Sequence, residues 1–102
     1  MIDLDKIKGF EWDKGNIDKS FRKHGITAKE AEEAFLDERT FLQEDIKHSE
    51  KEKRFIAIST TNQNKILFSI FTLRNDKIRI VSTRIANKKE RRLYEEKIKA
   101  NT

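Results

Sequence analysis

Cysteine and proline are absent from this chain of 102 residues, and glycine occurs only three times. Without cysteine there are no disulfides and no thiolate metal ligands, so the fold must depend on packed side chains, and a reducing compartment suits it. Three isolated glycines exclude a glycine-rich phosphate loop. Seven phenylalanines and one tryptophan, within a hydrophobic fraction of 35%, are nevertheless enough for the core of one domain, which we expect to span residues 1–102.

Long hydrophobic runs are also missing. No stretch is apolar over the length needed to cross a bilayer, and the first residues, MIDLDKIKGF, lack the basic start and apolar centre of a signal peptide. We therefore expect a cytoplasmic protein with no membrane partner.

Residues that could hold a metal ion or form a catalytic triad are not grouped in the sequence. Glu30, Glu32 and Glu33 occur together without a histidine nearby, a pattern typical of a solvated helix face. The two histidines, His24 and His48, lie in unrelated surroundings, which gives no basis for a Ser-His-Asp arrangement. The sequence predicts neither a metal nor a cofactor.

Charge is abundant and unevenly distributed. Residues 1–50 contain 9 Lys or Arg against 13 Asp or Glu, a net charge of −4, whereas residues 51–102 contain 14 against 5, a net charge of +9. A basic half of this kind is typical of proteins that bind nucleic acid or another polyanion, and an acidic protein partner would be attracted equally well.

Local signals predict a short strand and two helices in the first part of the chain. Residues 10–13 alternate apolar and polar side chains, as a strand does. The next helix ends at Gly25, which can adopt the left-handed conformation of a helix end. Thr27 and Glu30 then match a capping box that begins a second helix.

From Thr40 onward the hydrophobic period becomes that of strands. TFLQEDI shows it weakly, and RFIAISTT, ILFSIFTLR and KIRIVSTR show it clearly, with turns at residues 62–64 and 75–76. A last helix begins at Asn87, where Glu90 can complete the cap. We therefore predict an α+β domain with a mainly antiparallel four-stranded sheet, two helices before it and one C-terminal helix.

Cations on separate elements are the strongest candidates for a functional site. Three of them, Arg22, Lys23 and His24 in FRKHGIT, occupy a helix end, where the helix dipole favours positive charge. Three arginines lie on or beside two strands, namely Arg74, Arg79 and Arg84. Strand alternation places Arg79 and Arg84 on opposite faces unless a twist or bulge intervenes, and each arginine could instead form an ordinary surface ion pair.

The last helix starts with four cations, where the helix dipole disfavours them. They are Lys88, Lys89, Arg91 and Arg92. Either Glu90 and the pair Glu95 and Glu96 compensate for them, or a phosphate binds at the helix start. Trp12 can belong to the core or stack on a base.

Three segments together resemble the BrnT toxins of bacterial type II toxin–antitoxin pairs. These segments are FEWDKGNIDKSFRKHGIT, RFIAISTT with ILFSIFTLR, and IRIVSTRIANKKERRLYEE, and the likeness covers residues 10–96. The resemblance implies a RelE-like fold, ribonuclease activity that inhibits translation, and neutralisation by a BrnA-type antitoxin whose DNA-binding domain represses the operon. The family's KHG element corresponds to Lys23, His24 and Gly25, and its strand-end arginine corresponds to Arg84.

The resemblance assigns roles to the cations. RNA can be cleaved by its own 2′-hydroxyl without a metal, if side chains move protons and stabilise the phosphorane. We expect Lys23, His24 and Arg84 to be catalytic, with His24 protonating the leaving 5′-oxygen. The base for the 2′-hydroxyl stays open among Tyr94, a lysine and a carboxylate. RNA contacts are expected from Arg74, Arg79, Lys88, Lys89, Arg92 and Trp12.

Two other functions fit the same basic surface. The chain could be a non-catalytic module that binds RNA or acts as a co-repressor with an antitoxin, contacting operator DNA only through that partner. It could also be a domain that binds acidic proteins. Toxicity on expression distinguishes an enzyme from the first alternative, and RNA binding near physiological salt distinguishes it from the second.

Overall fold

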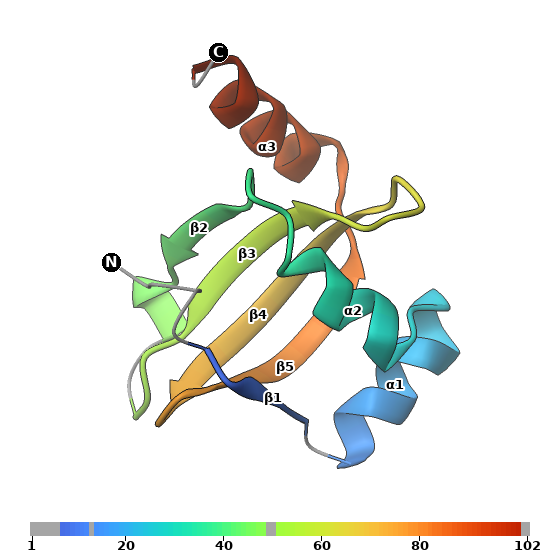
Figure 1. Ribbon diagram of the computed structural model, residues 1–102, viewed down its shortest axis with the longest axis vertical. Coiled ribbons are helices and arrows are strands. Elements are labelled where there is room, and N and C mark those ends of the chain that lie inside the picture. Colours follow the sequence, from blue (N-terminus) through green and yellow to red (C-terminus); the bar gives the residue numbers. More distant parts are fainter. Residues whose placement is uncertain (1–6, 13, 49–50, 101–102) are drawn as a thin grey trace.

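The computed structural model describes residues 7–12, 14–48 and 51–100, which form one sheet with helices on both sides (Figure 1). The strands are β1 (Gly9–Trp12), β2 (Phe41–Glu44), β3 (Phe55–Thr60), β4 (Ile66–Arg74) and β5 (Lys77–Ile85). The helices are α1 (Lys14–His24), α2 (Ala28–Ala34) and α3 (Lys88–Ala100), and a short 3-10 helix, η2 (Ile46–His48), follows β2. None of the helices in these ranges is both long and apolar enough to cross a membrane.

The sheet has five strands in the order β1-β5-β4-β3-β2, one more than the four expected. Strands β2 to β5 pair antiparallel, which confirms the predicted meander and the α+β class. The additional strand is β1, which pairs parallel with the first half of β5. Its alternating residues were recognisable as a strand, but a parallel partner more than 60 positions away leaves no local signal in a sequence.

One face of the sheet, the buried face, carries the main core and is covered by α2. Phe71 at its centre is fully buried, and its ring packs edge-on against Phe35 beyond the end of α2 and stacks with Phe55 on β3. Phe10 and Trp12 on β1 pack against the same cluster. The aromatic side chains therefore hold α2 and the edge strand β1 onto this face.

The opposite face, the cationic face, is covered differently. Helix α3 packs against β2 and β3 there, with buried Tyr94 contacting a small cluster around Ile58. The β4 and β5 part of the face carries Phe68, Thr72, Arg79 and Arg84. This face therefore combines a modest apolar contact with a region rich in positive charge.

Asp37 fastens α3 to the rest of the domain. Its Oδ2 accepts hydrogen bonds from the Tyr94 hydroxyl at 2.5 Å and from the Thr60 amide at 3.0 Å. Burial alone raises the pKa of Asp37, but these bonds, with a further one from the Arg39 amide, lower it below its ordinary value. Lys97 adds a second tie by donating to the Thr40 carbonyl at 2.6 Å.

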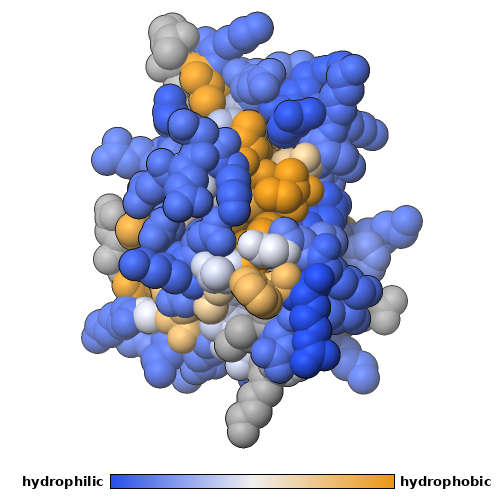
Figure 2. Space-filling model, turned by 90° about the vertical axis from the view of Figure 1, so that its right-hand side faces the viewer, coloured by the Kyte–Doolittle hydropathy of each residue, from blue (hydrophilic) through white to orange (hydrophobic). Residues whose placement is uncertain are grey.

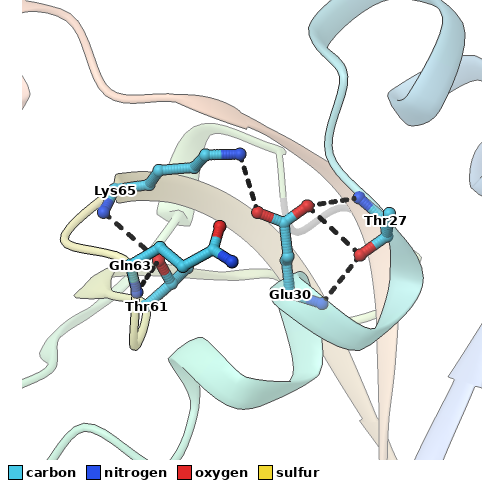
Figure 3. Close-up of polar contacts among 5 residues, drawn as sticks. All are labelled: Thr27, Glu30, Thr61, Gln63 and Lys65. Carbon is cyan, nitrogen blue, oxygen red and sulfur yellow. Dashed lines mark hydrogen bonds and ion pairs between the residues drawn. The ribbon is translucent and has the colours of Figure 1, made fainter.

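The helix ends are formed by the residues expected from the sequence. Gly25 has a φ of +66° and donates its amide to the Phe21 carbonyl, which ends α1. At the start of α2 the Thr27 hydroxyl accepts from the Glu30 amide, and the Glu30 carboxylate accepts from the Thr27 amide (Figure 3). Glu30 also pairs with Lys65 at 2.8 Å, so this cap links α2 to the β3–β4 turn.

The two tight turns depend on asparagine. Asn64 and Asn75 have φ values of 64° and 59°, which asparagine tolerates better than most residues. In the β4–β5 hairpin only Asn75 adopts positive φ, whereas Asp76 does not. The hairpin therefore differs from the two-residue turn with both φ values positive that its sequence permits.

Candidate active site

A bulge in β5 brings the strand arginines to one face. Ile70 pairs with Ser82 and Phe71 pairs with Ile80, so Val81 is an extra residue with no partner in β4. Arg79 is opposite Thr72 and Arg84 is opposite Phe68. Because Phe68 and Thr72 are four residues apart on β4, and paired residues share a face, both arginines lie on the cationic face.

Two adjoining hollows share Val81 in their linings. The first hollow, of about 290 Å³, lies between the end of α1 and β5 and is lined by Lys23, His24 and Ser82 among others. The second hollow, of about 590 Å³, lies between β4–β5 and the segment after β2, and Arg74 and Arg79 are among its lining residues. The bulge therefore lies at the junction of two sites that contain predicted functional residues.

The end of α1 supplies the cations of the first hollow. Lys23 and His24 are exposed, and α1 contacts β5 directly. Neither side chain has an ion pair or hydrogen bond with another of the described residues. Lys19 and Asn16, one and two turns earlier on α1, line the same hollow and were not identified as functional from the sequence. Lys19 lies four residues and Asn16 seven residues before Lys23, a spacing that places all three on one face of a helix and could have identified them.

Arg84 is on the cationic face but is already engaged by a carboxylate. Its Nη1 and Nη2 atoms each donate to a different oxygen of Glu90 at 2.7 Å, and its guanidinium lies 4.3 Å from the centre of the Phe68 ring. The bonds to Glu90 raise the pKa of Arg84. Burial raises the pKa of Glu90. The hydrogen bonds from Arg84 and from the Asn87 amide, with the charge of Arg84, lower this pKa by more than burial raises it, so the net shift is downward. Arg84 therefore joins β5 to the start of α3.

The other predicted RNA contacts are spread more widely. Arg74 pairs with Glu52, with Nε and Oε2 3.5 Å apart, inside the second hollow. Lys88, Lys89 and Arg92 are exposed on α3 and line neither hollow. Their helix begins with a reciprocal cap, in which the side chains of Asn87 and Glu90 each accept a hydrogen bond at 2.9 Å from the other's amide. This cap supports the alternative that Glu90 compensates for the cations at the start of the helix. Trp12 is half-buried against the core of the buried face, apart from the cations.

The second hollow contains residues that the sequence did not identify as functional. Lys47, His48 and Arg54 line it from the segment after β2, and Thr72 lines it from β4. His48 lies in η2, where its Nδ1 is 2.9 Å from Oδ2 of Asp45. Thr72 is a polar residue in the largely apolar strand ILFSIFTLR, but Ser69 is another, so the sequence alone did not distinguish it.

Tyr94 does not suit the role of the base for the 2′-hydroxyl. Its ring is 3% exposed, and its hydroxyl donates to Asp37. Burial raises the pKa of the phenol, and the hydrogen bond to Asp37 raises it further. A tyrosine in this setting keeps its proton at neutral pH.

The side of the molecule that carries α1 is mainly hydrophilic, with apolar side chains gathered in a strip near the middle of the view (Figure 2). The exposed large apolar residues include Phe21 on α1, Ile85 at the end of β5 and Leu93 on α3. Across residues 7–12, 14–48 and 51–100, no three histidine or acidic side chains are grouped so that they could hold a metal ion.

Comparisons with known proteins agree with this architecture. Residues 12–90 match the family model of the ribonuclease toxin BrnT of type II toxin–antitoxin systems. The crystal structure of the Brucella abortus ribonuclease toxin BrnT is similar in fold, with a TM-score of 0.59 and 19% sequence identity, over 78% of this chain and 97% of the other. No curated protein sequence matches the chain. Since the family model spans more than half of the residues, this chain belongs to the BrnT family of ribonuclease toxins.

Proposed function

We propose that this toxin cleaves RNA without a metal ion, by attack of the RNA's own 2′-hydroxyl on the adjacent phosphate. The observation that carries the proposal is the first hollow, where Lys23 and His24 from α1 meet Ser82 from β5. These exposed side chains come from two elements in contact, so a phosphate in the hollow can reach both cations. Positioned donors and cations of this kind stabilise developing negative charge.

The proposed reaction assigns one role to each cation. The 2′-oxygen forms a bond to phosphorus, the bond to the 5′-oxygen breaks, and the products carry a 2′,3′-cyclic phosphate and a 5′-hydroxyl. His24 donates the proton to the leaving oxygen, and Lys23 stabilises the non-bridging oxygens. A group other than Tyr94 accepts the 2′-hydroxyl proton.

Arg84 shares with Lys23 the stabilisation of the non-bridging oxygens, and Arg74 and Arg79 position the RNA on the cationic face. Arg84 lies on this face with its side chain 38% exposed, so a non-bridging oxygen can approach the guanidinium beside Glu90. Arg79 and Arg74 extend the positive surface into the second hollow. Lys88, Lys89 and Arg92, exposed at the start of α3, attract the RNA chain over a longer range.

The partner of this toxin is, in this proposal, an acidic antitoxin of the BrnA type. Membership of a type II toxin family implies an antitoxin, and the +9 charge of residues 51–102 favours acidic surface on that protein. The exposed Phe21, Ile85 and Leu93 offer apolar contact area beside the cations. Antitoxin and RNA then compete for the cationic face, operator DNA is bound through the antitoxin, and free toxin arrests translation in the cytoplasm.

Purified protein with a labelled single-stranded RNA tests the reaction. We expect cleavage that is unchanged by EDTA and that leaves a 2′,3′-cyclic phosphate, and no cleavage of the same oligonucleotide made with 2′-O-methyl sugars. Cleavage abolished by EDTA and restored by a divalent cation contradicts the metal-free reaction. Tight binding of RNA that stays intact supports the non-catalytic module instead.

A further inference from the structure

The second hollow has the chemistry of a phosphate site. Its cations come from three parts of the chain: Lys47 and His48 in η2, Lys51 and Arg54 before β3, and Arg74 and Arg79 on β4 and β5. Glu52 is also in the lining and pairs with Arg74. The lining therefore contains five lysines and arginines, one histidine that is paired with Asp45, and one carboxylate, which leaves the hollow with a clear positive excess.

A buried hydroxyl in this lining has no partner. Thr72 is 3% exposed, and its Oγ1 forms no hydrogen bond with any of the described residues. Burying a hydroxyl without a partner costs free energy. Thr72 is among the residues that line the hollow, so a ligand bound there can accept this hydrogen bond and offset the cost. Thr72 is paired with Arg79 across the β4–β5 ladder, so the hydroxyl and a guanidinium start from adjacent positions on one face.

We propose that the second hollow binds a phosphate of the RNA substrate next to the scissile one, with the Thr72 hydroxyl donating to a phosphate oxygen. This inference rests on the proposed function, because it takes the first hollow as the place of cleavage. Val81 lines both hollows, so an RNA strand that leaves the first hollow across the bulge enters the second. A volume of about 590 Å³ falls within the range of pockets that hold small ligands and is roomy enough for a nucleotide.

The subsite predicts that Thr72 contributes to RNA affinity rather than to the chemical step. A hydrogen bond to a charged phosphate is worth enough to change affinity by about tenfold. Uniform binding of this kind changes KM and leaves kcat unchanged, because the contact exists in both the ground state and the transition state. Loss of one arginine contact to the same phosphate reduces the slope of log affinity against log salt by about 0.7.

The test compares Thr72→Val with Ser59→Ala. Ser59 carries the other buried hydroxyl without a partner among the described residues, and it lies on the buried face, away from both hollows. For Thr72→Val we expect about tenfold weaker binding of a 2′-O-methyl oligonucleotide, a matching rise in KM on the cleavable RNA and an unchanged kcat. Thr72→Ser should restore the affinity, and Ser59→Ala should bind like wild type.

Two outcomes overturn the subsite. One is a Thr72→Val protein that folds and binds the 2′-O-methyl RNA as wild type does, and the other is an equal loss of affinity in Ser59→Ala. If Thr72→Val does not fold, the subsite is tested with Arg79→Gln. In that variant an unchanged slope of log RNA affinity against log salt also overturns the subsite. A wild type that cleaves no RNA defeats the proposed function, yet the binding comparison still tests the subsite by itself.

Discussion

The two faces of the sheet differ in what their central residues contact. On the buried face, Phe71 and its aromatic neighbours are packed under α2, and polar residues such as Ser69 and Thr83 bond to each other at 3.0 Å. On the cationic face, arginines and lysines border two hollows. Each face has one buried hydroxyl without a partner among the described residues, Ser59 and Thr72, but only Thr72 lines a hollow. We propose that the first face contributes mainly to stability and the second mainly to RNA binding and cleavage, although both belong to the same five-stranded sheet.

The largest expected effect is loss of cleavage in His24→Ala. A general acid contributes about 10²- to 10⁴-fold to rate, so we expect kcat on RNA to fall by that factor. Stability should change little, since His24 is exposed. The matched control is Arg22→Ala, which removes an exposed cation from the same helical turn but from outside both hollows, and it should retain nearly full activity. Equal activity in both variants contradicts the role of His24.

Truncation on the buried face should affect stability more strongly than the equivalent truncation on the cationic face. Phe71 is fully buried, so Phe71→Ala should cost about 3–5 kcal/mol in the free energy of unfolding measured with urea. Phe68, its neighbour on the cationic face, is only half-buried, and Phe68→Ala should cost clearly less. Equal losses would mean that the two faces do not differ in this way.

The tie between α3 and the domain should make stability depend on pH. Asp37 has a lowered pKa, so its stabilising effect is complete above the ordinary value of 3.8 and is lost as pH falls through the folded-state value. Tyr94→Phe removes one of its donors and should cost about 1.5–3 kcal/mol at neutral pH. In that variant acid unfolding should also begin at higher pH. An unchanged midpoint of acid unfolding would show that the lowered pKa of Asp37 does not depend on the hydrogen bond from Tyr94.

The smallest effect is expected from Glu90→Gln. This change removes the carboxylate charge that neutralises Arg84 while keeping a side chain of the same size. If Arg84 binds phosphate, RNA affinity should rise by a few-fold, because more of the guanidinium charge becomes available. Unchanged affinity, with a lower free energy of unfolding, would restrict Arg84 to joining β5 and α3.

Features that depend on neighbouring residues were predictable from the sequence. The glycine at the end of α1, the capping box of α2 and the asparagine cap of α3 all involve residues within four positions of each other. The antiparallel meander followed from strand periods and short turns. These signals fix local structure before any distant contact forms.

The features that create the site depend on distant residues and were not predictable in this way. The bulge at Val81 places Arg79 and Arg84 on one face, whereas regular alternation separates them. The bond from Arg84 to Glu90 depends on how α3 is placed relative to β5. The packing of Trp12 against the core depends on the pairing of β1 with β5. Thr72 shows the same limit, because its burial and missing partner become visible only once β4 lies beside the segment after β2.

The most direct test of the account is to map RNA binding on the labelled protein by NMR with a 2′-O-methyl oligonucleotide. We predict that the largest amide shifts occur at residues 22–24 and 79–84, beside the two hollows. Small shifts are expected around Ala31 and Phe35, which cover the buried face. The largest shifts at α2, or weak shifts spread evenly over the surface, would contradict the claim that the cationic face binds the RNA.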